Sequence, residues 1–178
     1  MKSKLGLLYA WFIFTLTFFL PDQKLIMRFR GWLYSFAMPS CGSNFQVSNN
    51  TKILGIDKLF VGNDVFLATG CVINTGGEIH LKNGVLIGIN SVVVAGNHTM
   101  LNGSYRFGIR QLKPIVIGAG SWIGANVTIT AGSTVPESSV VAANSVYLSS
   151  NDVAGVYAGV PAKLIKSSHD VHKNGNNI

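Results

Sequence analysis

His98 is the side chain of this sequence best placed to do acid–base chemistry. It stands where a regular repeat in the chain breaks off, which no other of the four histidines does. A neutral imidazole can take the proton from a hydroxyl as that oxygen attacks a carbonyl carbon. No carboxylate lies close to His98 in the sequence, so a backbone carbonyl or a group from another segment or subunit must orient its ring. The alternative is an ordinary surface histidine.

Cys41 and Cys71 are the two cysteines. Both stand at positions of the repeat that point inward, which predicts small buried hydrophobic side chains. No spacing motif supports a disulfide or a catalytic thiol.

The repeat has a period of six and is clearest between residues 117 and 146. The repeating aliphatic residues are Ile117, Ile123, Ile129, Val135 and Val141, and three positions after them stand Gly120, Asn126, Gly132, Ser138 and Asn144. A period of six fits neither a helix nor a single strand. It describes a short strand and then a corner, where Gly and Asn tolerate positive φ. Stacked triangular coils of this kind form a parallel β-helix.

The same repeat extends back to Cys41, which predicts one β-helix domain over residues 39–168. Further corners are expected at Asn44, Asn50, Asp64, Gly70, Gly76, Gly84, Asn90 and Gly96. The register fails after His98, so residues 99–114 are predicted to be a loop pushed out of the coil, and such loops are usually functional. Residues 158–163 form a tight turn into a short element that ends at Ser168. Residues 169–178 are a polar tail.

The first 38 residues predict two helices of unusual character. Residues 5–20 are almost all apolar but too few to span a bilayer, and no small residues mark a signal-peptide cleavage site. Residues 24–36 form a basic amphipathic helix. Ten of the eighteen aromatic residues precede Pro39. We expect peripheral membrane association; the alternative is that the helices only cap the open end of the coil or pack on a neighbouring subunit.

Composition limits the classes of partner. Hydrophobic residues make up 48% and charged residues only 12% of the 178-residue chain, which favours a membrane surface or a subunit interface. The net charge is +7, but the basic residues form no stripe and no nucleic-acid motif is present. Nucleic acid is therefore not expected as a partner.

Five features together resemble the left-handed β-helix acyltransferases, and among them the O-acetyltransferases of the galactoside, maltose and surface-polysaccharide type. These features are the repeat, the loop after His98, and the segments Lys113–Gly118, Ser121–Gly124 and Ala158–Lys163. The resemblance implies a mainly β, left-handed parallel β-helix and a homotrimer. It also implies that acetyl-CoA and an acceptor meet in a cleft between neighbouring coils and react directly, without a metal.

The resemblance assigns roles to particular residues. His98 matches the catalytic histidine, and Asn90 matches a second active-site residue that holds the substrate or the oxyanion, although Asn also suits a corner. The cofactor contacts carry over to Trp122, Gly124, Ala125, Ala143, Gly159, Lys163 and Lys166. Leu148-Ser149 departs from the family pattern, where a threonine or lysine is common. In the loop, Tyr105, Arg106, Phe107 and Arg110 are candidates for acceptor binding.

The leading hypothesis is an acetyl-CoA-dependent O-acetyltransferase acting on a saccharide or lipid-linked glycan in surface polysaccharide biosynthesis. It would work in the cytoplasm at the inner face of the plasma membrane, where acetyl-CoA is found. Alternatives are acetylation of a small soluble amine or hydroxyl compound, and a non-catalytic β-helix module. A zinc site for carbon dioxide hydration would need His80 and His98 to stack, with a third ligand from His169 or His172.

Overall fold

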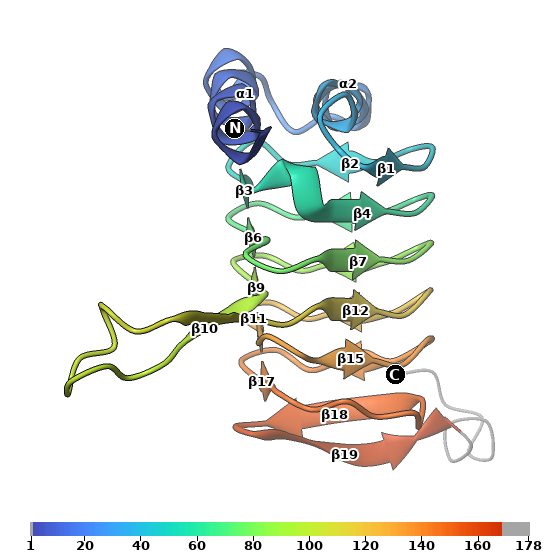
Figure 1. Cartoon of the computed structure of the whole chain (residues 1–178). Coiled ribbons are helices and arrows are strands. Elements are labelled where there is room, and N and C mark those ends of the chain that lie inside the picture. The colour runs from blue at the N-terminus through green and yellow to red at the C-terminus, as the bar shows by residue number, and fades with distance from the viewer. Residues whose placement is uncertain (1, 169–178) are drawn as a thin grey trace.

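The molecule is a three-sided parallel β-helix with two helices across one end (Figure 1). The computed structural model describes residues 2–168. Each coil contributes one strand to each of three parallel sheets, as the six-residue repeat predicts. Sheet A contains β1 (Ser40–Cys41), β4 (Leu59–Val61), β7 (Ile79–Leu81), β12 (Ile115–Ile117) and β15 (Thr134–Val135). The mainly β, left-handed β-helix class expected from the sequence is confirmed.

The other two sheets complete the prism. Sheet B contains β2 (Gln46–Val47), β5 (Phe66–Leu67), β8 (Leu86–Ile87), β13 (Trp122–Ile123), β16 (Val140–Val141), β18 (Gly155–Gly159) and β19 (Ala162–Ser167). Sheet C contains β3 (Lys52–Leu54), β6 (Val72–Asn74), β9 (Val92–Val94), β14 (Thr128–Ile129) and β17 (Val146–Tyr147). Because each sheet keeps its register from coil to coil, a residue's position in the repeat decides which face and which corner it occupies.

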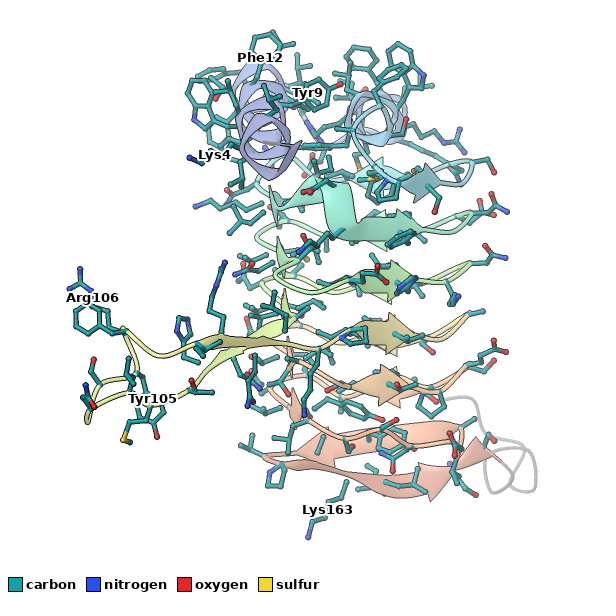
Figure 2. The ribbon with its side chains drawn as sticks, viewed as in Figure 1. Lys4, Tyr9, Phe12, Tyr105, Arg106 and Lys163 are labelled. Carbon is teal, nitrogen blue, oxygen red and sulfur yellow. The ribbon has the colours of Figure 1, made fainter. Side chains whose placement is uncertain are left out.

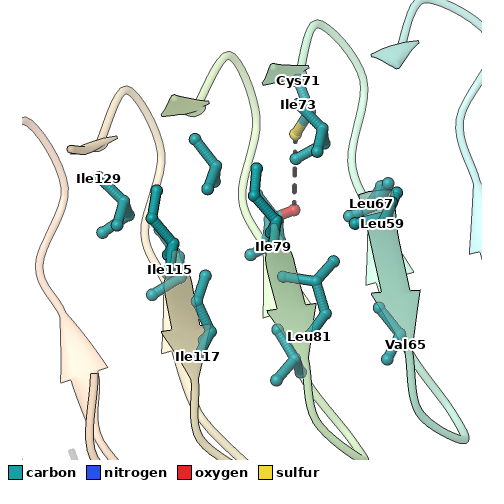
Figure 3. Packing of buried hydrophobic residues seen from close by; sticks show 14 of the residues in the cluster. Leu59, Val65, Leu67, Cys71, Ile73, Ile79, Leu81, Ile115, Ile117 and Ile129 are labelled. Carbon is teal, nitrogen blue, oxygen red and sulfur yellow. Dashed lines mark hydrogen bonds between the residues drawn. The ribbon is translucent and has the colours of Figure 1, made fainter. Parts of the chain in front are cut away.

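The core is a stack of aliphatic side chains from all three sheets (Figure 3). Ile73, Ile79 and Ile117 are fully buried, and Cys71 is buried among them as predicted, while Cys41 is half-buried. Buried serines line the corners, where they bond to backbone groups of the next coil. The Ser121 hydroxyl, for example, donates to the Pro136 carbonyl at 2.7 Å.

Positive φ marks most of the predicted corners. All five corners expected between residues 117 and 146 have it, with φ of 51° at Ser138 and 85° at Gly132. Positive φ is absent at Asn50, Gly76 and Gly96, although Asn50 lies in a turn and Gly76 in a bend. Gly76 and Gly96 stand at the corner from sheet C to sheet A, where extra residues lengthen the turn. Asn50 belongs to the first coil, whose corner meets the linker between the helices.

The interruption of the repeat leaves the coil as a short hairpin that carries residues 99–109 as a loop at its end. Strands β10 (Gly96–His98) and β11 (Arg110–Leu112) pair antiparallel and project sideways from the prism (Figure 1). We call residues 96–112 the arm. It starts three residues earlier than the predicted boundary, because the backbone pairing already begins at Gly96 opposite Leu112.

The far end of the prism is closed by a second hairpin. The predicted turn at residues 158–163 joins β18, which pairs parallel with β16, to the antiparallel strand β19. A cis peptide bond precedes Pro161 in this turn. The polar tail lies outside the described residues.

The near end is covered by α1 (Lys2–Thr17) and α2 (Lys24–Ser35). A short 3₁₀ helix, η1 (Ile56–Lys58), lies beneath α1. The inward sides of α1 and α2 bury Ile13, Arg30 and Tyr34. The predicted capping of the open coil is confirmed. Within residues 2–168, no helix has the length and apolar character needed to cross a bilayer.

Candidate active site

His98 lies at the root of the arm, where strand pairing places it opposite Arg110. Residues paired in this way carry their side chains on the same side of the ribbon, with Cβ atoms about 5 Å apart. The His98 side chain is exposed. No hydrogen bond or ion pair reaches its ring from another residue of the described chain. The arm therefore presents an open imidazole with a guanidinium beside it.

Asn90 lies at the other end of strand β9 from His98, at the corner from sheet B to sheet C. It has φ of 57°, and its backbone N–H donates to the Thr69 carbonyl at 3.0 Å. Gly70 occupies the same corner one coil earlier, and a Cβ there would collide with the Asn90 amide oxygen. The corner role foreseen for Asn90 is confirmed. Its chemical role stays a prediction, because one chain does not bring Asn90 to His98.

Small residues from four successive coils form a column at this same corner. A Cβ on Gly88 would lie 2.6 Å from the carbonyl carbon of Gly124, and one on Gly124 would lie 2.7 Å from the Ala143 nitrogen. Asn144 N–H donates to the Ala125 carbonyl at 3.0 Å. We call Gly88, Gly124, Ala125, Ala143 and Gly159 the small-residue column. No column residue has a side chain larger than a methyl group, as a flat ligand lying along the backbone would require.

Trp122 and the two lysines flank the column to different extents. Trp122 projects outward from sheet B and is 48% exposed, one residue before the column's corner begins. Lys163 pairs with Ala158 beside Gly159 and extends past the last strand (Figure 2). Lys166 lies three residues further along β19, about 10 Å away by the rise of a strand. Lys163 is therefore at the column and Lys166 is not.

The four candidate acceptor residues separate into two groups. Only Arg110 is beside His98. Tyr105 and Arg106 lie at the distal end of the arm (Figure 2), where the Arg106 guanidinium stands 5.5 Å from the centre of the Phe107 ring. A saccharide at His98 would touch the tip residues only if it extended along the arm.

The stacked pair of histidines that a zinc site requires is not formed. His80 lies on β7 of sheet A, stacked on Phe60 at 4.4 Å and paired with Glu78 at 3.1 Å. His98 leaves the prism on the arm, so the two rings face different surroundings. Across residues 2–168, no group of three or more potential ligands comes together. His169 and His172 lie outside the described residues.

Comparison with known proteins supports the reading of the fold. No family model matches the chain. It is 28% identical over 156 residues to WcaF of Escherichia coli, which is provisionally named a colanic acid biosynthesis acetyltransferase; the match covers 88% of this chain and 84% of that protein. It is also 28% identical over 137 residues to the galactoside O-acetyltransferase of E. coli, covering 75% of this chain and 56% of that one.

Solved structures agree. A hexapeptide-repeat acetyltransferase of Vibrio cholerae, complexed with acetyl coenzyme A, matches with a TM-score of 0.77 and 25% identity, covering 92% of this chain and 87% of that one. In both sequence and fold, the chain is similar to hexapeptide-repeat acetyltransferases. A galactoside acetyltransferase bound to coenzyme A matches with a TM-score of 0.84, covering 99% of this chain and 87% of that one. Because the two sequences are only 21% identical, this match supports the fold alone.

The candidate residues divide into two half-sites. One corner of the prism carries the small-residue column with Asn90, and the arm carries His98 with Arg110. Sequence reasoning missed Gly88, because the arm separates it from the later repeats and hides that it stacks on Gly124. A glycine preceding an αL asparagine by two positions was the available signal.

Proposed function

We propose that this acetyltransferase moves the acetyl group of acetyl-CoA to a hydroxyl of a saccharide, with His98 as the general base. The observation that carries the proposal is the exposed His98 ring in the strand-paired base of the arm. An imidazole with no partner of its own is available to a substrate hydroxyl. The relatives named for galactoside and polysaccharide substrates support a saccharide as the acceptor.

Acetyl-CoA would lie along the small-residue column. Close backbone approach at Gly124 and Ala143 leaves a narrow edge for the pantetheine chain. Trp122 offers an aromatic face beside this edge, and Lys163 offers a point charge to the phosphates at its end. Lys166 would contact the cofactor only where the phosphates reach past Lys163 along β19.

The two half-sites support assembly into a homotrimer. Within one chain, His98 and the column are at opposite ends of sheet C, so donor and base do not meet. The arm projects away from its own prism (Figure 1). In a homotrimer it would contact the prism of a neighbouring copy. A complete site would then combine the arm of one copy with the column of the next.

The reaction needs one base and no covalent enzyme intermediate. The His98 imidazole removes the proton from the acceptor hydroxyl as its oxygen attacks the thioester carbonyl carbon. Asn90 of the neighbouring column is available to donate its amide N–H to the oxyanion that forms. The C–S bond then breaks, and the CoA sulfur takes the proton from the imidazolium. The products are the acetyl ester and CoA.

We place this reaction in surface polysaccharide biosynthesis, at the cytoplasmic face of the plasma membrane. Acetyl-CoA is a cytoplasmic donor, and the acceptor would be a lipid-linked precursor or a growing glycan. Peripheral membrane association through the N-terminal helices belongs to the proposal.

The test is the variant His98→Ala, assayed with acetyl-CoA and a panel of saccharides. Loss of a general base predicts a fall in kcat of about 10²- to 10⁴-fold with acetyl-CoA affinity unchanged. His80→Ala is the matched control, because that ring lies on sheet A, away from the arm and the column. Undiminished turnover by His98→Ala would refute the assignment.

A further inference from the structure

The outward side of the helical pair is an apolar surface that no segment of residues 2–168 covers. We call this the cap surface; among its members are Trp11, Phe12, Phe19, Leu25, Trp32 and Phe36. Phe19 is 87% and Leu25 is 78% exposed. The inward sides of the same helices already bury Ile13 and Tyr34 against the first coil. Capping the prism therefore does not account for the outward side chains, which exceed the scattered apolar exposure of ordinary surfaces.

The charge around the cap surface is mainly positive, although the half-buried Asp57 lies beneath α1. Lys4, Lys24 and Lys52 are exposed at its edge, and Arg28 is half-buried. The one acidic residue of the helical segment, Asp22, is held 3.0 Å from Arg30 in an ion pair. Aromatic and aliphatic side chains ringed by lysines suit the headgroup region of an anionic bilayer. A soluble protein partner would not require this bias.

A groove beside α1 adds a second feature that points to lipid. Its volume is about 320 Å³, and it runs between α1 and β3 with Leu7, Trp11, Phe14 and Leu54 on its walls. Tyr34 lies at its floor, and no residue of the described chain hydrogen-bonds to the Tyr34 hydroxyl. Lys52 stands at the rim. An apolar groove with a cationic rim matches a hydrocarbon chain attached to a phosphate.

We infer that the cap surface lies in an anionic bilayer leaflet, with one lipid chain in the groove and the prism standing away from the membrane. Lys52 on the first coil would then lie at the level of the lipid phosphates. Lys4 extends from α1 on the side toward which the arm projects (Figure 2), so its charge also faces lipid headgroups there.

This orientation fixes the distance of His98 from the bilayer. This step of the inference rests on the proposed function. The arm leaves after β9, two coil steps beyond β3, which is about 10 Å at the spacing of paired strands. The distance from the axis of α1 to the first coil on which it packs adds about 10 Å more. His98 would work about 20 Å from the axis of α1. The acceptor is then a lipid-linked oligosaccharide, whose reacting sugar is separated from its phosphate by other sugars.

Vesicle co-sedimentation of the full-length protein tests the docking. We expect binding to vesicles of phosphatidylcholine with phosphatidylglycerol and weaker binding to phosphatidylcholine alone. Trp11→Ser with Phe12→Ser should weaken binding about tenfold or more, since binding scales with apolar area. Lys24→Glu should weaken binding about tenfold on anionic vesicles only, and added salt should do the same.

Val153→Ser is the matched control, because Val153 is 49% exposed at the opposite end of the prism. Circular dichroism and unfolding midpoints show that each variant is folded. Vesicle binding that is absent in the wild type, or equal in the double variant and the control, overturns the inference. A double variant that instead lowers the oligomeric state and leaves vesicle binding unchanged also overturns it, in favour of a second copy on this surface.

A separate measurement distinguishes this failure from failure of the proposed function. His98→Ala should bind vesicles like the wild type while losing acetyl transfer, so the two properties are independent. A galactoside oligosaccharide is supplied free or coupled to a lipid in vesicles. The double variant should lose about tenfold or more of the rate with the tethered acceptor and none with the free one. Equal loss on both acceptors overturns the tethered-acceptor inference.

Discussion

Replacing Arg30 with methionine should detach the helical cap from the prism. The Arg30 guanidinium is 1% exposed and donates five hydrogen bonds, to Thr17 Oγ1, the Thr17, Leu20 and Val47 carbonyls, and Asp22 Oδ1. The contact to the Val47 carbonyl is 2.6 Å. One side chain therefore joins the end of α1, the linker, α2 and the first strand of sheet B.

The expected loss follows from the acceptors that methionine leaves without a partner. The bonds to the Thr17 and Val47 carbonyls are buried, and a buried polar group without a partner costs about 1–3 kcal/mol. Removing a buried guanidinium also returns part of its desolvation penalty. We expect the free energy of unfolding to fall by about 2–4 kcal/mol. Lysine at this position keeps the charge but loses the planar fork, so Arg30→Lys should give an intermediate loss.

Urea unfolding followed by tryptophan fluorescence measures this loss, with hydrogen exchange to locate it. Exchange should quicken in α1 and α2 before it does in the coils. Arg28→Met is the control, because Arg28 is half-buried and its side chain bonds to Asn44 alone; it should cost about 1 kcal/mol. An Arg30→Met protein as stable as the wild type, with helix exchange unchanged, would show that burial of the guanidinium outweighs its contacts.

Three further predictions concern the coils. Ser138 adopts φ of 51°, a strained value for serine, so Ser138→Gly should raise the free energy of unfolding by about 1 kcal/mol. Ser139→Gly, which removes a buried hydroxyl, should lower the free energy of unfolding. A lower free energy of unfolding in Ser138→Gly would contradict the claim that the Ser138 backbone is strained. Gly88→Ala should lower the free energy of unfolding by about 1–3 kcal/mol, because the new Cβ meets the Gly124 backbone, and it should weaken acetyl-CoA binding measured by calorimetry. Gly96→Ala is the control, because its Cβ meets only the end of the Leu112 side chain. An equal effect of both substitutions on acetyl-CoA binding would rule out the small-residue column as the cofactor site. Burial raises the pKa of the Cys71 thiol to about 11 from 9.0, so the thiol's contribution to the free energy of unfolding is present below pH 9 and is lost as the pH rises through 11. The free energy of unfolding, measured at these two pH values, should fall less in Cys71→Ala than in the wild type. An identical fall in the two proteins refutes the linkage.

The hexad pattern was sufficient to predict the prism, because inward aliphatics and αL corners are local requirements that each coil repeats. It predicted the corners at Asn126 and Asn144, whereas Gly124, Ala125 and Ala143 were singled out only by the family resemblance. The hairpin pairing of the arm was not foreseen, since residues 99–112 carry no strand periodicity, and backbone pairing begun at Gly96 extends into them. Positive φ is absent at Gly76 and Gly96 for a related reason, because inserted residues lengthen the turn there.

The separation of His98 from the column was also beyond the reach of the sequence. Counting residues places Asn90 and His98 eight apart, which suggests neighbours, yet a strand with corners at both ends holds them apart. Arg30 was read only as one of several basic residues on a helix. Arg30 joins the helices to the first coil through hydrogen bonds to Thr17 and Val47. These residues are distant from Arg30 in the sequence, and no local pattern predicts that they contact it.

The closed ends of the stack have a consequence for solubility. Every coil of a parallel β-helix is a template for another, so two open ends would let molecules join end to end into fibres. Arg30 occupies the Val47 carbonyl at one end, where an incoming strand would otherwise bond. At the other end the chain turns back on itself in β19, a strand that carries Lys163 and Lys166. One buried guanidinium and one antiparallel strand thus occupy the two edges of sheet B, and the helical pair covers the near end of the prism.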